Sequence, residues 1–321
     1  MTTLNIPNTF VVDTPADAPP VNANFTAIST WANGNVDQTN ISGSAKLPPT
    51  ILNNLAGTAN CRTYGISGSP LQDTTSSGVS SIYVGPWQGN QVAIYDGSAN
   101  WTLYSLAETS YSVGALSNGV YDVYLYVSGG ALEVGTSAWS GNTPPTRSLV
   151  SGVWTGTSTT YRLVGCIAVT SNKTLDYTGV RGIWNFQNLS RKGLLAAIPT
   201  ASWTVSATSF GAADSNTTVG QGAFYYLIGV TGAPPVEATF TSFAQQVTGT
   251  GSFNNGIGIN STSATTVTGE VSTTTGAYNA TCSTFDNTVG YNYMQQLEKI
   301  ATHNFTSYGN GNSGLTGLGS F

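Results

Sequence analysis

Short apolar runs separated by small polar turns dominate the sequence. The clearest run spans residues 121–127, where nearly every position holds a β-branched, aliphatic or aromatic side chain. Gly129 and Gly130 follow as a two-residue turn, and residues 131–139 have the pattern of a returning strand. Two such runs joined by a Gly-Gly turn predict a β-hairpin.

The segments around this hairpin have the same character. Residues 161–170 form the most apolar run of the chain, and residues 181–186 form a shorter one. Each segment has the length of a strand, and none keeps the 3.6-residue period of a helix. Further strands are predicted at residues 81–84, 91–95 and 101–104. Consecutive short strands predict an antiparallel β-sandwich or jelly roll rather than alternating strands and helices.

The C-terminal part continues the strand pattern with a looser signal. The segment 291–300 could be mistaken for a helix, but Val289, Tyr291, Tyr293 and the flanking glycines favour a strand. The other strands expected here lie at residues 224–230, within 236–247, and at 256–259. We therefore expect a second β-domain after the first.

Residues near the N-terminus follow a helical period instead. Val21, Phe25, Ile28 and Trp31 fall at positions i, i+4, i+7 and i+10, which is one apolar stripe along a helix. A helix of about four turns is marginal by itself in water. The stripe must therefore pack against something: copies of itself around a three-fold axis, a separate structure to which the chain attaches, or the chain's own β-region.

These patterns divide the chain into three parts. We interpret residues 1–60 as an attachment and trimerisation segment, residues 61–200 as a β-sandwich domain, and residues 201–321 as a C-terminal β-sandwich domain. The predicted fold class is mainly β, with a short N-terminal helical anchor followed by two antiparallel β-sandwich, jelly-roll-like domains. The anchor residues are the apolar stripe already named, and no residue is singled out for receptor binding.

Composition changes the picture of the surface. Charged residues make up only 7% of the chain, whereas soluble proteins average roughly 25%. Glycine reaches 38 residues, and 16 Tyr, 11 Phe and 7 Trp supply ample material for a core. The nine Lys and Arg residues are scattered, which argues against a nucleic-acid partner. No apolar run is long enough for membrane insertion.

Candidate chemistry is sparse. The only histidine, His303, falls in a predicted strand, and no Ser-His-Asp set can be assembled around it. Cys61, Cys166 and Cys282 have no metal-binding spacing, and Cys166 is most simply a small buried apolar residue. We expect no catalytic residue, no metal and no cofactor, and therefore no enzyme. Two carboxylates would suffice for a glycosidase, but none stands out among Glu108, Asp122, Glu133, Asp176, Glu237, Glu270 and Asp286.

Aromatic side chains offer another chemistry, because exposed rings can stack on sugars. Trp87 lies in a predicted turn and has the best claim to exposure, whereas a strand tryptophan such as Trp184 is more often part of a core. The remaining candidates are Trp101, Trp139, Trp154 and Trp203.

Four stretches resemble bacteriophage tail-fibre and virion-fibre proteins, and one of them is the run within residues 84–104. The first is the N-terminal string from Asp17 to Ile41, which is similar to a "DAxxVNxNFxxI…WxNGxVxxxNI" pattern that opens many such proteins. The C-terminal half is similar to the family at residues 256–264, 290–298 and 314–317. In the middle stretch the matching positions are Trp139, Arg147, Gly152, Val153, Tyr161, Leu163, Gly165, Arg181, Trp184, Asn185 and Asn188.

This resemblance implies a setting. The protein would be a virion structural protein, made in the host cytoplasm without a signal peptide and released by lysis. Its N-terminus would attach to a phage head or tail protein. From the residues themselves, packing of the short apolar helix around an axis predicts a homotrimer. The loops of residues 201–321, rich in Ser, Thr, Asn, Gly and Tyr, predict contact with a host surface glycan or protein. The alternatives are a capsid-decorating fibre without receptor binding and a glycan-cleaving tail spike.

Overall fold

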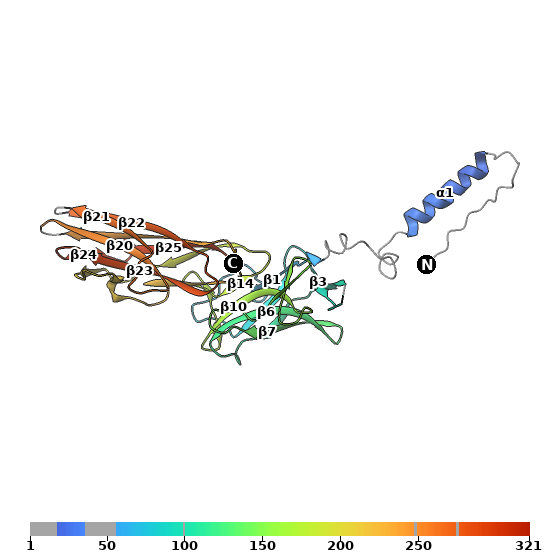
Figure 1. Ribbon diagram of the computed structural model, residues 1–321, viewed down its shortest axis with the longest axis horizontal. Coiled ribbons are helices and arrows are strands. Elements are labelled where there is room, and N and C mark those ends of the chain that lie inside the picture. Colours follow the sequence, from blue (N-terminus) through green and yellow to red (C-terminus); the bar gives the residue numbers. More distant parts are fainter. Residues whose placement is uncertain (1–17, 36–55, 99, 247–248, 274–275) are drawn as a thin grey trace. The chain divides into compact units, whose positions relative to one another are not determined.

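The computed structural model describes residues 18–35 and 56–321, except residues 99, 247–248 and 274–275. The chain is mainly β, built from several antiparallel sheets, as the sequence predicts (Figure 1). It divides into two compact units, residues 1–54 and residues 55–321. Of the first unit the structure describes the helix α1, Ala18–Asn35. This helix contains residues 21–31, for which the sequence predicts a helical stripe.

The second unit begins with two small sheets. One is three-stranded in the order β1-β2-β5, and the other pairs β3 with β4. Several of their apolar side chains are fully buried, among them Ile82, Val84 and Val92. The strands are β1 (Cys61–Tyr64), β2 (Ser81–Pro86), β3 (Gln91–Tyr95), β4 (Trp101–Ser105) and β5 (Thr109–Ser112).

A seven-stranded sheet follows, with the order β7-β6-β10-β9-β8 and with β11 and β14 also paired to β10. The predicted hairpin is confirmed: β6 and β7 pair in register from Tyr121 with Ala138 to Ser128 with Ala131. Both turn glycines, Gly129 and Gly130, have positive φ, which a two-residue hairpin turn of this kind requires. The strands are β6 (Gly119–Ser128), β7 (Ala131–Ala138), β8 (Ser148–Val150), β9 (Val153–Thr155), β10 (Arg162–Thr170), β11 (Lys173–Thr174) and β14 (Ile183–Asn185).

Two asparagines that carry the family resemblance hold β1 in place. The side-chain oxygen of Asn185 accepts a hydrogen bond from the backbone N–H of Thr63 at 2.7 Å. The side-chain N–H groups of Asn188 donate to the carbonyl oxygens of Ala59 and Cys61 at 2.9 and 2.8 Å. Asn185 therefore joins β14 to β1, and Asn188 joins the bend after β14 to the chain at the start of β1, so both side chains have a structural role.

Two further sheets make up the C-terminal region. One has the order β12-β13-β18-β23-β20-β21, with β17 also on β23, and the other has the order β15-β25-β19-β24-β16, with β22 also on β19. The segment 291–300 is a strand, as predicted. The first sheet contains β12 (Asp176–Tyr177), β13 (Val180–Arg181), β17 (Gly211–Ala212), β18 (Ala223–Ile228), β20 (Gly251–Ile259), β21 (Val267–Thr273) and β23 (Gly290–Ile300). The second contains β15 (Arg191–Ala196), β16 (Ser202–Val205), β19 (Val236–Gln246), β22 (Gly276–Asp286), β24 (Phe305–Tyr308) and β25 (Gly314–Ser320).

The sheets do not divide at residue 200, where we predict the domain boundary. Strand β15 precedes that residue but pairs over its whole length with β25, and β13 pairs with β18. Between β13 and β15 in the sequence, β14 pairs with β10 of the preceding sheet. The chain therefore passes between the two groups of sheets more than once within residues 176–196. The largest buried apolar cluster also spans both groups, from Val120 to Phe321.

Gly182 is the single residue between β13 and β14, at one of these passages. Its backbone N–H donates to the carbonyl oxygen of Leu175 at 2.9 Å, and its own carbonyl accepts from Ala168 at 2.8 Å. A Cβ atom at this position would lie 2.5 Å from the Leu175 oxygen. The close approach of the two backbones therefore requires glycine here.

Candidate functional site

A buried ion pair lies beneath the candidate site. Asp122 projects from β6 and is completely buried. Its carboxylate accepts a hydrogen bond from the indole N–H of Trp139 at 2.7 Å and another from Nε of Arg147 at 2.9 Å. A further bond joins Nη2 of Arg147 to the Asp122 carboxylate. The arrangement satisfies a buried carboxylate that would otherwise be costly to desolvate.

Arg147 is held rigidly by its surroundings. Its guanidinium carbon lies 5.0 Å from the ring centre of Trp139 and 5.1 Å from that of Phe186. Nη1 donates to the carbonyl oxygen of Gly229 at 2.6 Å, and Gly229 follows β18 in the C-terminal region. The side chain of Trp184 covers Gly229 so closely that a Cβ there would meet it at 2.1 Å. Arg147 thus links the sheet that contains β6 to the turn after β18 in the C-terminal region.

Cys166 completes the buried cluster. Its sulfur lies 3.4 Å from Oδ1 of Asp122 and 3.6 Å from Nη2 of Arg147. Burial, reinforced by the charge of Asp122, raises the pKa of the Cys166 thiol well above its ordinary value. The thiol therefore stays protonated and donates to the carboxylate. The expectation that Cys166 is a small buried residue is confirmed.

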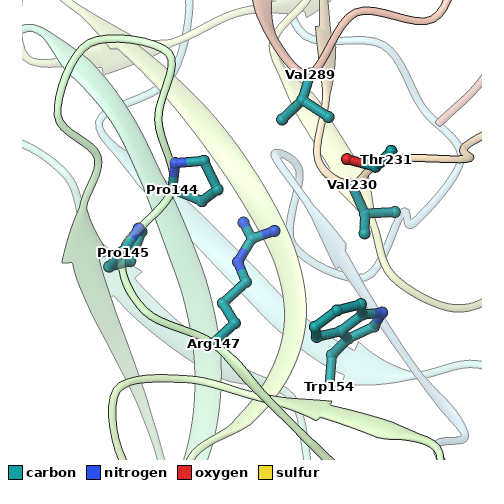
Figure 2. Close-up of a pocket in the computed structure, with 7 residues that line it drawn as sticks. All are labelled: Pro144, Pro145, Arg147, Trp154, Val230, Thr231 and Val289. Carbon is teal, nitrogen blue, oxygen red and sulfur yellow. The ribbon is translucent and has the colours of Figure 1, made fainter.

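A pocket of about 260 Å³ opens beside Arg147. Figure 2 shows the guanidinium group rising between Pro144 on one side and Val230 on the other, with the indole of Trp154 near Val230. The hydroxyl oxygen of Thr231 points toward the interior in the same view. Three chain segments far apart in sequence supply the lining: Pro144, Pro145, Arg147 and Trp154; Val230 and Thr231; and Val289.

The local strand pattern explains why Trp154 faces outward. It lies in the middle of β9, whose two neighbouring positions, Val153 and Thr155, are buried. Side chains alternate between the faces of a strand, so the indole is directed to the other face, where it is 36% exposed. The turn at Ser151 and Gly152, both with positive φ, sets this register.

The walls of the pocket are mostly apolar. The polar groups of its lining side chains are the Thr231 hydroxyl, the indole N–H of Trp154 and the Arg147 guanidinium, and Asp122 already balances the charge of the guanidinium. None of the lining side chains is a nucleophile paired with a base.

The predicted anchor residues lie elsewhere, on α1. Phe25 is 66% exposed and Ile28 is 42% exposed, whereas Val21 is partly buried. Phe25 and Ile28 are three residues apart in the helix, so they share one face. Trp31 belongs to the same helix, but its side chain lies outside the described residues.

The exposure of the tryptophan side chains differs in part from the expectation. Trp184 is buried, as predicted for a strand tryptophan, and so are Trp101 and Trp139. Trp87, expected to be the most exposed, is half-buried, with the guanidinium of Arg62 5.7 Å from its ring centre. This expectation was wrong, because a turn position does not prevent packing against the neighbouring strand. Among the tryptophans whose side chains the structure describes, Trp154 is the one classed as exposed, and the strand alternation around it was the signal that could have found it.

The remaining candidates for chemistry are dispersed. His303 lies in the bend between β23 and β24 with φ of 60°, so its predicted strand position was wrong. Asp176 is engaged by Lys192 at 2.5 Å and Asp286 by the hydroxyl of Tyr226 at 2.6 Å. Within the described ranges no three His, Cys, Asp or Glu side chains come together in a way that could hold a metal ion. Nor is any helix of those ranges long and apolar enough to span a membrane.

Comparisons with known proteins add little. No protein-family model matches the sequence, and no curated protein matches it at a significant level. The crystal structure of dimeric latent PorU from Porphyromonas gingivalis is 13% identical, with a TM-score of 0.28 over 64% of this chain and 20% of that chain. The insecticidal delta-endotoxin Cry8Ea1 from Bacillus thuringiensis is 7% identical, with a TM-score of 0.25 over 76% of this chain and 49% of that chain.

A structure of carbohydrate-binding modules from the β-sandwich superfamily is 11% identical, with a TM-score of 0.18 over 82% of this chain and 100% of that chain. The present chain thus spans only about a fifth of PorU and about half of the endotoxin. Likenesses this weak carry no argument about the function of this protein.

Proposed function

We propose that this protein is a phage virion structural protein, a fibre-like appendage with an N-terminal anchor and jelly-roll-like β-domains. It attaches to the particle by its N-terminus, assembles as a homotrimer, and contacts the host surface through its C-terminal β-region. The observation that carries the proposal is the exposed apolar face of α1. Phe25 and Ile28, 66% and 42% exposed, lie on the helix of the first compact unit.

The physical reason is the cost of such a face. Burying a side chain of this size is worth about 1.5–3 kcal/mol relative to leaving it exposed. A helix of 18 residues gains little from its own hydrogen bonds in water and depends on packing of its apolar face. The helix therefore needs a partner, and the resemblance of this stretch to phage-fibre anchors supports a particle protein and neighbouring copies as that partner.

The β-body supports the second half of the proposal. A chain with 7% charged residues presents hydroxyl, amide and aromatic groups to its surroundings. Paired exposed hydroxyls on β19 and β22, such as Thr239 with Ser283 at 2.9 Å, illustrate this surface. Groups of this kind form hydrogen bonds and ring contacts with uncharged polar ligands such as glycans.

Particle incorporation tests the anchor. Deleting residues 1–45 should leave the β-body folded, by circular dichroism, but absent from purified phage particles probed with antibody. The full-length chain expressed in parallel is the control and should be incorporated. A truncated chain that still enters particles would place the anchor elsewhere.

Soluble full-length protein tests the host contact. Added in excess to host cells, it should bind saturably and reduce infection by competing with the particle, without shortening surface polysaccharide. Shortened polysaccharide would instead indicate a glycan-cleaving tail spike. If the protein neither binds to host cells nor competes with infection, the remaining alternative is a capsid-decorating fibre.

A further inference from the structure

We infer that the pocket between Trp154 and Val230 binds a sugar ring of an uncharged glycan, with the indole of Trp154 as the surface on which the ring stacks. This inference rests on the proposed adhesive function. It places the contact where the sheet of β6 and β10 meets the C-terminal sheets, rather than in loops of residues 201–321 alone.

The size of the pocket limits the ligand. Pockets for drug-sized molecules occupy about 300–1,000 Å³, and this one measures about 260 Å³. It therefore suits a single ring-sized group with the rest of a longer chain left outside. A terminal or branching sugar of a surface glycan has that form.

The charge of the pocket favours a neutral sugar over an acidic one. Arg147 is the cation among the lining residues, and Asp122 neutralises it through two hydrogen bonds. A uronate or sialate would have to share that guanidinium with a buried carboxylate in a poorly solvated environment. Two carboxylates that share one guanidinium repel each other, so the site should discriminate against carboxylated sugars.

One donor nevertheless remains for the ligand. A guanidinium carries five N–H groups, and four are directed to Asp122, Cys166 and Gly229. The fifth, on Nη1, is available to a sugar hydroxyl. Since the Arg147 side chain is only 6% exposed and tightly packed, this donor is fixed in position before the ligand arrives.

The other lining groups match the two kinds of surface on a pyranose. Its C–H face packs on an aromatic ring, and Trp154 offers one that is 36% exposed. Its hydroxyl rim needs hydrogen-bond partners, and the exposed Thr231 hydroxyl offers a donor and an acceptor. Pro144 and Pro145 close the opposite wall without an N–H of their own.

The test uses the full-length protein on a printed array of neutral and carboxylated oligosaccharides, followed by titration of the best neutral probe. Trp154→Ala should weaken binding about tenfold or more, since loss of a stacking surface removes at least 1.4 kcal/mol. Thr231→Val, which keeps the shape, should weaken it about fivefold. Trp154→Phe should restore part of the affinity.

Phe285→Ala provides the matched control, because Phe285 is a 65% exposed aromatic outside the pocket. It should leave binding unchanged. Binding of carboxylated probes alone, or of no neutral probe, would overturn the inference. Equal binding by Trp154→Ala and the unaltered protein would also overturn it, yet leave adhesion through another surface standing. Particle incorporation is read separately, so failure of the pocket is distinguishable from failure of the fibre proposal.

Discussion

Glu298 is a carboxyl side chain buried within the C-terminal sheets. It lies on β23 and is 3% exposed. Its carboxyl group accepts hydrogen bonds from the indole N–H of Trp203 at 2.8 Å and from the Ser307 hydroxyl at 3.1 Å. Desolvation outweighs these bonds and, with the charge of Asp214, raises the pKa of Glu298 to about 7.

This raised pKa predicts that stability falls as the pH rises. The unfolded chain releases the Glu298 proton near pH 4.3, whereas the folded chain holds it to about pH 7. The contribution is therefore fully present below pH 4.3 and lost by about pH 7, and it amounts to roughly 3 kcal/mol. Glu298→Gln should remove most of this difference in urea unfolding measured at pH 5 and pH 8. Glu270→Gln, at an exposed carboxylate, should keep it, and an unchanged slope in Glu298→Gln would contradict the prediction.

At the scale of elements, the passage of the chain through Gly182 should be intolerant of any side chain. Gly182→Ala brings a Cβ to 2.5 Å from the Leu175 carbonyl oxygen, where neither backbone is free to move. We expect a loss of about 1–3 kcal/mol in the free energy of unfolding. Gly193→Ala is the control, because a Cβ there meets nothing within 4 Å, and urea titration of both variants gives the comparison. Equal stabilities would show that the sheets adjust at this point.

The sequence predicts the positions of the strands better than it predicts which strands pair with each other. Strand runs and the hairpin at Gly129 and Gly130 depend on neighbouring residues, so their pattern is visible in the chain itself. The pairing of β15 with β25 joins residues more than a hundred positions apart, and no local pattern marks it. The pocket cannot be predicted from the sequence for the same reason. Arg147 stands out in the family resemblance, but no local pattern shows that Val230 and Val289 lie near it in the fold.

At the scale of the whole molecule, the apolar face of α1 predicts assembly. Replacing both Phe25 and Ile28 with Ser should convert a trimer into a monomer at micromolar concentration, since each protomer loses about 3–6 kcal/mol of burial. Light scattering on the purified full-length protein measures the mass directly. Leu149→Ser, an exposed apolar residue of the β-body, should leave the trimer intact. A monomeric unaltered protein would refute the trimer.

The passage of the chain between sheets at residues 176–196 also bears on how such a protein could be recombined. A chimera that exchanges everything after residue 200 would separate β25 from β15 and β18 from β13, and each exposed edge would invite pairing with another chain. The C-terminal sheets and the short strands β13 and β15 must therefore be exchanged together. A C-terminal segment exchanged as one piece would begin before Asp176, and its recipient would need a sheet able to pair with β14.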